Sequence, residues 1–317
     1  MKKFKTMLLA VLCSTTLLMS PPLNVSAASG YLSSAEFISY DQSVSGKLSD
    51  DEKEYYGFKV NEGDGYRVYL DNFVDYNYDW DDEGNEIHKP LNFNDSTILI
   101  SLVNEHDSEI DSVSYRMEDQ GTDYYTFQAP YTGNMYLKFD NSSRAEYTFH
   151  IEEYQLSKGT EILDDYNNHY KVIGKNKVAF IAPFSKNQES ISIDSTIKND
   201  GIEYEVTQIA ANAFKNNKKL YSVYLPDSLI SIGNNAFSGC KKLDYVTFPS
   251  DLQTIGKNAF YKCSSLQTIE FKGIIKKIGK NAFNGTKNGA YIYVPSKKKY
   301  KSLLKNSGLR KYYLMNN

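Results

Sequence analysis

The residues of this 317-residue chain that could do metal chemistry are gathered in one acidic segment, residues 71–95. Within it, Asp79, Asp81, Glu83 and Gly84 imitate the opening of a calcium-binding loop. The twelfth position of such a loop needs a Glu that binds calcium through both oxygens, and this chain has Pro90 there. We therefore exclude a calcium hand and interpret the segment as a solvated acidic loop. The alternative is a looser calcium site built from Asp75, Asp79, Asp81 and Asp82.

The histidines and cysteines are not spaced for catalysis. The four histidines are dispersed, without metal-ligand spacing and without a nucleophile motif nearby. Cys240 and Cys263 occupy equivalent positions in neighbouring segments and could form a bridge in an exported protein. Equivalent positions alone do not establish disulfide geometry, so we favour two buried thiols. We expect no catalytic residue, no bound metal and no enzymatic activity.

Similar sequence segments repeat every 23 residues near the C-terminus, and they must form the elements that position any functional side chain. An Ala-Phe pair recurs with this step, and so do flanking positions that hold Ile, Leu and Val. A fixed period of this length with an L-x-x-[VI]-x-[LF] core predicts a leucine-rich-repeat solenoid, a stack of coils that presents a surface. The repeated phenylalanines are expected to align inside the stack: Phe214, Phe237, Phe260 and Phe283.

Two polar columns keep the same period and suggest structural roles. Gly233, Gly256 and Gly279 follow a repeated Ile, where a tight turn can require a positive φ. The asparagines that precede the Ala-Phe pair are expected to cap a short helical turn or to form an amide ladder. These asparagines are Asn212, Asn235, Asn258 and Asn281.

Residues 1–28 have the pattern of a secretory signal peptide. Lys2, Lys3 and Lys5 precede an apolar run, and small residues at 25–28 offer a cleavage site. The run is too short for a membrane span, and no later stretch reaches about 18 apolar residues. We therefore expect a secreted, extracellular protein without a membrane span, which could associate with the cell wall.

Charge is divided unequally along the mature chain. Residues 29–158 hold 27 Asp and Glu against 9 Lys and Arg, a net charge of −18. Residues 159–317 hold 12 acidic against 24 basic residues, a net charge of +12. Opposite charges of this size predict a contact between the two halves, within one molecule or between molecules.

The pattern of residues predicts a mainly β protein with two parts. Residues 29–155 alternate polar and apolar residues between turns, as in an antiparallel β-sandwich. Residues 156–205 are expected to form a β cap on the solenoid, and residues 206–297 four leucine-rich repeats of 23 residues. Residues 298–317 are expected to form a basic, short helical cap.

The strand core of each repeat should turn alternate side chains toward solvent on the concave sheet. Tyrosine is frequent there, either because it serves as a contact residue or because it suits exposed strands. The predicted ligand-binding residues are Tyr221, Tyr224, Asp244, Tyr245, Thr247, Glu270, Tyr291 and Tyr293. Lysines of the last segment could instead contact a polyanion: Lys297, Lys298, Lys299, Lys301 and Lys305.

Two resemblances extend this interpretation. The "IGxNAF" motif with its 23-residue step resembles the BspA-type leucine-rich repeat of bacterial surface and secreted proteins, over residues 160–317. That resemblance implies adhesion or cell-surface interaction without enzymatic activity. The segments "SVSGKLSDDEKEYYGFKV" and "GNMYLKF" resemble the bacterial pre-peptidase C-terminal domain, a small β-sandwich. It implies an accessory module for binding or spacing, which in some members uses calcium.

We therefore predict a secreted, non-enzymatic adhesion or interaction protein that binds a host, matrix or cell-surface ligand through its solenoid. The alternative is a cell-envelope protein whose basic half is held by anionic wall polymers or glycans. The expected partner is an extracellular protein or glycan. Nucleic acid is not expected, because no recognition motif accompanies the basic charge.

Overall fold

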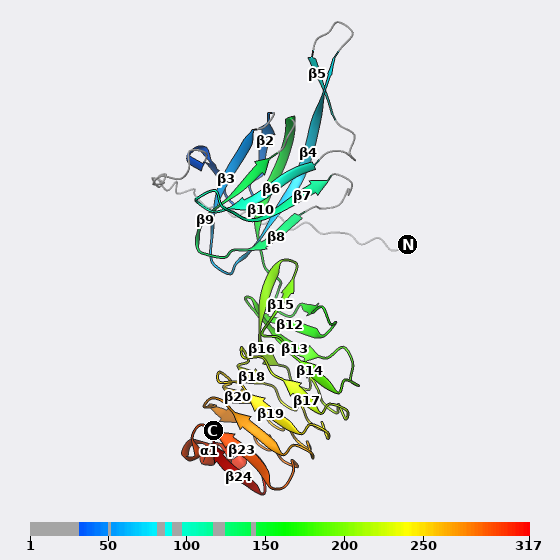
Figure 1. The fold of residues 1–317 in the computed structure, drawn as a ribbon, viewed down its shortest axis with the longest axis vertical. Helices are drawn as coiled ribbons and strands as arrows, with labels where there is room; N and C mark the ends of the chain where they lie inside the picture. The colour runs from blue at the N-terminus through cyan, green and yellow to red at the C-terminus, as the bar shows by residue number, and fades with distance from the viewer. Residues whose placement is uncertain (1–31, 50–51, 81–85, 91–96, 117–123, 141–143) are drawn as a thin grey trace, which may run out of the picture.

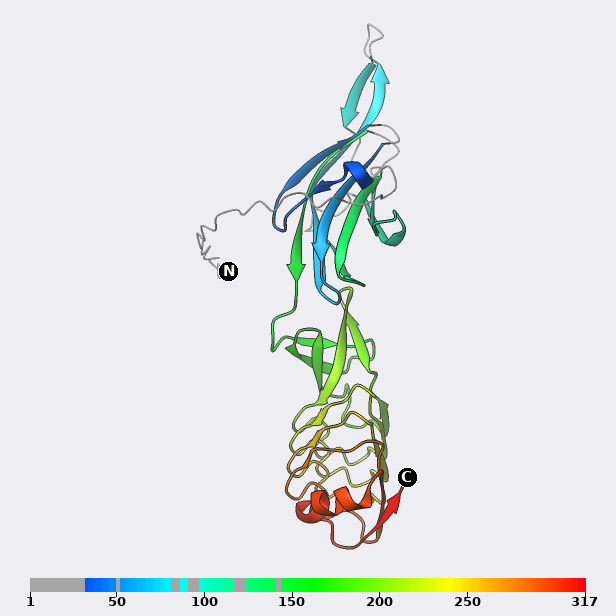
Figure 2. The ribbon, with the colours of Figure 1, turned by 90° about the vertical axis from the view of Figure 1, so that its left-hand side faces the viewer.

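The protein consists of two bodies stacked end to end along one long axis (Figures 1 and 2). The computed structural model confirms the mainly β fold with a C-terminal solenoid. The predicted signal peptide lies outside the described residues, and no helix in the described ranges is long and apolar enough to cross a membrane. The structure describes residues 32–49, 52–80, 86–90, 97–116, 124–140 and 144–317.

The N-terminal domain is built from two five-stranded sheets, after a 3-10 helix η1 (Leu32–Ser34). Neighbouring strands are antiparallel, except that the two-residue β1 pairs with β3 in parallel. The first sheet has the order β1 (Glu36–Phe37), β3 (Lys53–Val60), β9 (Gly133–Asp140), β6 (Thr97–Val103) and β7 (Glu109–Arg116). The second has the order β2 (Val44–Leu48), β10 (Arg144–Tyr154), β4 (Gly65–Trp80) and β5 (Glu86–Pro90), with β8 (Tyr124–Gln128) on β4.

The core of this domain lies between the two sheets. Alternate side chains of a strand point to the same face, so β10 buries Tyr147, Phe149 and Ile151 in one row. Phe139 of the first sheet stacks on Tyr147 of the second, with ring centroids 4.4 Å apart. The apolar residues that alternate in the sequence are therefore the ones that both sheets turn toward the shared core.

Five strands connect this domain to the coils. β13 pairs in parallel with β16, and β16 begins the ladder of short strands that continues through the coils. One hydrophobic cluster runs from Ile162 to Leu304, so these strands and the coils share a single core. The strands are β11 (Glu161–Leu163), β12 (His169–Gly174), β13 (Lys177–Ala182), β15 (Thr196–Asn199) and β16 (Ile202–Ile209).

Each coil contributes one longer and one shorter strand, and both kinds pair in parallel with the next coil. The longer strands stack on one side, as a pair and a sheet of four: β14 (Ser190–Ser192), β17 (Ser222–Tyr224), β19 (Tyr245–Phe248), β21 (Thr268–Phe271), β23 (Ala290–Val294) and β24 (Tyr312–Asn316). The shorter strands follow β16 on another side: β18 (Ser231–Ile232), β20 (Thr254–Ile255) and β22 (Lys277–Ile278).

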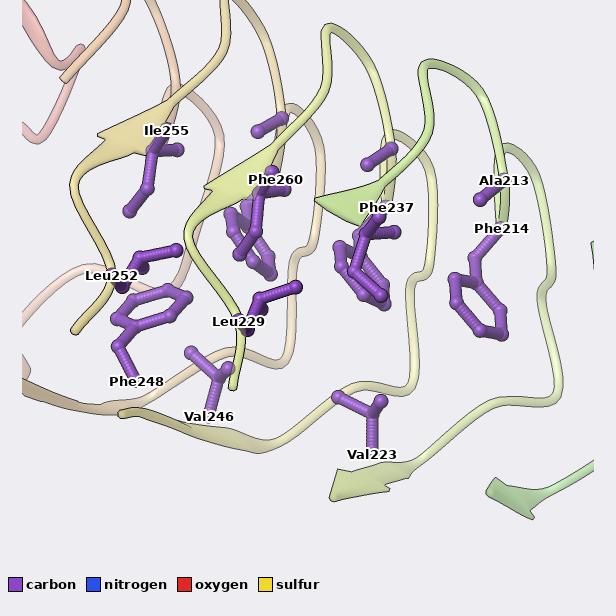
Figure 3. Close-up of a cluster of buried hydrophobic side chains, with 14 of the residues drawn as sticks. Ala213, Phe214, Val223, Leu229, Phe237, Val246, Phe248, Leu252, Ile255 and Phe260 are labelled. Carbon is purple, nitrogen blue, oxygen red and sulfur yellow. The ribbon is translucent and has the colours of Figure 1, made fainter. Parts of the chain in front are cut away.

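The repeated phenylalanines form a column of stacked rings inside the solenoid (Figure 3). Ring centroids of consecutive members are 4.9 to 5.4 Å apart, and the planes lie within 13° of parallel. Phe180 of β13 extends the column by one ring, 5.0 Å from Phe214. Burying one such ring contributes about 1.5–3 kcal/mol. The column is therefore a main source of cohesion between coils.

The glycine and asparagine columns have roles different from those predicted. Gly233, Gly256 and Gly279 do not adopt a positive φ; instead, a Cβ on Gly233 would lie 2.4 Å from the backbone nitrogen of Ala211 in the preceding coil. These glycines allow consecutive coils to approach closely. The left-handed backbone belongs to the asparagines, which tolerate it better than most residues. Their φ angles are 65° at Asn212, 57° at Asn235, 56° at Asn258 and 58° at Asn281.

Cys240 and Cys263 are free, buried thiols, as predicted. Each S–H donates to a phenylalanine carbonyl of the preceding coil, Cys240 to Phe214 and Cys263 to Phe237, both at 3.1 Å. Burial raises the pKa of Cys240 to about 12 and that of Cys263 well above its ordinary value. Neither thiol is therefore a nucleophile at neutral pH.

The C-terminal segment contains one strand more than the sequence indicated. The helix α1 (Lys297–Leu303) and the 3-10 helix η2 (Leu304–Asn306) form the short helical cap. The chain then continues as β24, which pairs with β23 in parallel. The predicted helical cap therefore also supplies the last strand of the solenoid.

The two bodies meet at a joint where the β15–β16 hairpin reaches the N-terminal domain. The guanidinium of Arg67 lies between the rings of Tyr124 and Tyr154, 4.0 and 3.4 Å from their centroids, and pairs with Asp200 at the hairpin tip. Gln128 exchanges hydrogen bonds with the backbone of Glu203, at 3.3 and 3.5 Å.

The joint contains one ion pair that agrees with the contact predicted from net charge and one that does not. Lys175 pairs with Asp64, which joins the basic half to the acidic half as expected. The Arg67–Asp200 pair has the reverse polarity, because its cation comes from the acidic half. One ion pair thus follows the net charges of the two halves and the other opposes them, so net charge alone does not account for the joint.

Arg67→Ala is expected to loosen this joint. The substitution removes two cation–π contacts and leaves Asp200 without its partner, a loss on the order of 2–4 kcal/mol in the free energy of domain association. Small-angle scattering should show a larger radius of gyration and a broader distance distribution than the parent protein. Arg310→Ala, an exposed arginine at the far end, is the control and should leave the profile unchanged. An unchanged profile for Arg67→Ala would show that the other joint contacts suffice.

Candidate binding surface

The outward side chains of the longer strands form a continuous surface, which we call the tyrosine face. Pairing aligns Tyr245 with Thr268, Tyr291 and Tyr313, and Thr247 with Glu270, Tyr293 and Met315. The intervening residues, such as Val246 and Ile269, point inward and are buried. The face is defined by Tyr221, Ser222, Tyr224, Tyr245, Thr247, Thr268, Glu270, Tyr291, Tyr293, Tyr313 and Met315.

Several aromatic rings on this face are open to solvent. Tyr224 is 56% exposed, and Tyr221 and Tyr291 are each exposed by about half. The other predicted ligand-binding residues are half-buried: Asp244, Tyr245, Thr247, Glu270 and Tyr293. The strand pairing aligns Tyr245, Thr247, Glu270, Tyr291 and Tyr293, whereas Tyr224 lies on β17 and Tyr221 and Asp244 lie just before β17 and β19.

Hydrogen bonds hold the centre of the face in place. Ser222 Oγ and the Tyr245 hydroxyl are 3.1 Å apart, and Thr247 donates to Glu270 at 3.2 Å. Hydrogen bonds with Ser222 and Tyr224 lower the pKa of Tyr245, and the bond with Tyr245 raises the pKa of Tyr224. Side chains fixed in this way lose little conformational entropy when a partner binds.

The structure adds two residues to the predicted surface. Tyr313 is 58% exposed and stacks on Tyr291 with ring centroids 5.3 Å apart, and Met315 lies beside Tyr293 in the next column. They were missed because the repeat shortens by one residue here, from 23 to a step of 22. The alternation in "YYLMN", which parallels "AYIYV" of β23, was the available signal.

The predicted polyanion contacts lie at the C-terminal end of the solenoid, between β23 and β24 in the chain. They are exposed side chains of α1 and η2: Lys297, Lys298, Lys299, Lys301 and Lys305.

The calcium alternative falls largely outside the described part of the chain. Asp75 and Asp79 lie in β4, but their side chains are not among the described ones, and Asp81 and Asp82 lie outside the described residues. Among the residues that the structure describes, no group of three His, Cys, Asp or Glu could hold a metal ion.

Comparisons with known proteins were made for the whole chain. A leucine-rich repeat protein from Bacteroides capillosus is 22% identical with a TM-score of 0.38, over 49% of this chain and 97% of that one. A leucine rich cell surface protein from Faecalibacterium prausnitzii is 24% identical with a TM-score of 0.39, over 50% of this chain and 43% of that one. A periplasmic inhibitor of g-type lysozyme from Salmonella Typhimurium is 18% identical with a TM-score of 0.23, over 37% of this chain and 96% of that one. No curated protein matches the chain.

One family model matches the chain, the BspA type leucine rich repeat region, in six copies over residues 185–317. Six is also the number of longer strands in the stack, from β14 to β24, and exceeds the four repeats predicted from the sequence. The additional units are the ones that begin and end the array, where the repeat is least regular. The six-copy match, the 23-residue period and the stacked coils agree that residues 185–317 are similar to a BspA type leucine rich repeat region.

Proposed function

We propose that this protein is an exported, non-enzymatic interaction protein whose tyrosine face contacts a partner outside the cell. The observation that carries the proposal is the group of exposed tyrosines on and beside the longer strands: Tyr224 of β17, Tyr221 just before it, and the stacked pair Tyr291 and Tyr313 of β23 and β24. Tyrosine is enriched at protein interfaces because its ring supplies apolar area and its hydroxyl supplies a hydrogen bond.

Other features support the same proposal. Leucine-rich-repeat solenoids serve as interaction scaffolds, and their strand surfaces are extended binding surfaces. The N-terminal sequence has the pattern of a secretory signal, which would place that surface outside the cell. We assign the N-terminal domain as an accessory module of the pre-peptidase C-terminal type, which carries the solenoid on a fixed joint.

Removing rings from the tyrosine face is expected to weaken binding by about 10- to 100-fold, because buried tyrosine anchors contribute about 2 kcal/mol or more. The variant is Tyr221→Ser/Tyr224→Ser/Tyr291→Ser. Binding is measured by interferometry on immobilised collagen, fibronectin and fibrinogen, and by flow cytometry on epithelial cells.

The matched control is Tyr166→Ser, a tyrosine that is 71% exposed on the turn before β12. It should bind like the parent protein. If none of these surfaces binds the parent protein, or if the triple variant binds as well as the parent, the tyrosine face is not the contact surface.

A second candidate function is retention in the cell envelope by charge. Residues 159–317 carry a net charge of +12, and an extracellular anionic polymer is the natural counterpart of such a surface. This candidate requires a place on the solenoid where cations gather without carboxylate partners.

A further inference from the structure

Basic side chains gather at the start of each longer strand, beside the tyrosine face. From β17 to β24, two neighbouring residues before each strand occupy equivalent positions in successive coils, and every such pair except Ser264–Ser265, before β21, includes a cation. We call this group the basic row. Its members are exposed: Lys218, Lys219, Lys241, Lys242, Lys287, Arg310 and Lys311.

Hydrogen bonds between coils show that the row runs along the edge of the stack. The backbone of Lys241 accepts from Ser265, that of Leu266 accepts from Lys287, and that of Lys311 accepts from Gly289, at 2.8 to 3.2 Å. Adjacent strands lie about 4.8 Å apart, so the cations follow one another at intervals of one or two strand spacings.

The described part of the chain supplies no carboxylate partner for the cations of this row. Within the described ranges, none of them lies within ion-pair distance of a carboxylate, whereas Lys171, Lys175 and Lys177 each form an ion pair. The ammonium of Lys287 is instead 2.6 Å from the amide oxygen of Gln267. Uncompensated like charges in a row repel one another, and an anionic partner would relieve that repulsion.

The row ends in a pocket that combines charge with aromatic rings. Arg310, Lys311, Tyr312 and Tyr313 line an open pocket of 470 Å³, together with Asn288 and Gly289. The pocket offers cations for an acidic group, and amide and hydroxyl groups for hydrogen bonds. Its volume accommodates a sugar unit.

The kind of partner follows from the composition of the row. Protein interfaces are depleted in lysine, and this row is almost entirely lysine without an apolar anchor among its members. The row supplies positive charges at regular intervals, and the tyrosine face beside it supplies exposed rings. A matching polymer would repeat an anionic group for the lysines and a flat, weakly polar surface, such as a sugar ring, for the tyrosines. We propose that the basic row and the adjoining tyrosine face bind a linear anionic polysaccharide. This inference rests on the second candidate function. It assigns the polyanion contact to the basic row at the edge of the coils, and not to the lysines of α1 and η2 that the sequence suggested.

The test compares three variants of the full chain that each remove three positive charges. Lys218→Gln/Lys241→Gln/Lys287→Gln changes the basic row. Lys297→Gln/Lys298→Gln/Lys299→Gln changes the C-terminal helix. The control, Lys276→Gln/Lys277→Gln/Lys280→Gln, changes exposed lysines in and around β22, in the ladder of shorter strands.

The probes are dextran sulfate and polygalacturonate, which carry sulfate and carboxylate groups on sugar chains, with polyglutamate as the acidic polypeptide. The row variant is expected to bind both polysaccharides about tenfold more weakly than the parent, as three exposed charge contacts would give. The other two variants should stay within about twofold. Preference for one polysaccharide identifies the acidic group.

Three results would overturn the proposal. They are an equal loss in all three variants, no binding of either polysaccharide at 0.15 M salt, and polyglutamate binding as tight as that of polygalacturonate. The last result would assign the row to an acidic polypeptide. The row variant should still bind any protein surface that the tyrosine face recognises, so failure here is distinguishable from failure of the principal proposed function.

Discussion

Phe237→Ala is expected to lower the free energy of unfolding of the solenoid by about 3–5 kcal/mol. The ring is fully buried and stacks between Phe214 and Phe260, with centroids 4.9 Å from both. Its removal leaves a cavity that the neighbouring coils cannot close, because inter-coil hydrogen bonds fix their spacing. Urea unfolding followed by circular dichroism measures the loss.

Phe184→Ala is the matched control for this substitution. Phe184 is 66% exposed on the segment before β14, so its loss should change the free energy of unfolding by about 0.5 kcal/mol or less. Equal effects of the two substitutions would contradict the assignment of the stacked column as the core of the solenoid.

Gly233→Ala is expected to destabilise the solenoid by about 3 kcal/mol or more, although it adds a single methyl group. The added carbon would lie 2.4 Å from the nitrogen of Ala211 and 2.7 Å from the carbonyl carbon of Ala210. Both contacts are with backbone atoms, so no side chain can move aside. Two coils would have to separate, and thermal unfolding should show a clearly lower midpoint.

Gly174→Ala provides the contrast within the same part of the protein. A Cβ there meets nothing within 4 Å, and the backbone angle suits any residue. Replacement should leave stability unchanged or raise it by about 0.4–1 kcal/mol through the unfolded state. A neutral result for Gly233→Ala would show that the coils are not in close backbone contact at this column.

The solenoid was predictable because its core is periodic. A column such as Phe214, Phe237 and Phe260 can be identified from the spacing alone, and the fixed step places each member in the same environment. The positions of the tyrosines followed in the same way, since alternation within a strand assigns inward and outward side chains.

The parts that escaped prediction depend on contacts between residues distant in sequence. The sequence shows that glycine and asparagine columns exist, but whether Gly233 or Asn235 takes the positive φ depends on how closely coils approach. Arg67 pairs with a residue 133 positions away, and no local pattern indicates that partner. Tyr313 was missed because one residue fewer separates the last two strands.

The direction of the hydrogen bonds between coils has a mechanical consequence. In the solenoid these bonds run along the long axis, whereas strands such as β3 and β9 in the N-terminal domain lie along it (Figure 2). A force that pulls on the two ends of the protein would therefore break the hydrogen bonds between coils one coil at a time. The strands of the N-terminal sheets would instead be loaded in shear, with all hydrogen bonds between two strands sharing the force. Each released coil of 23 residues would add about 75–80 Å of extended chain. Under such a pull, the solenoid would therefore yield first and extend, while the N-terminal domain would resist.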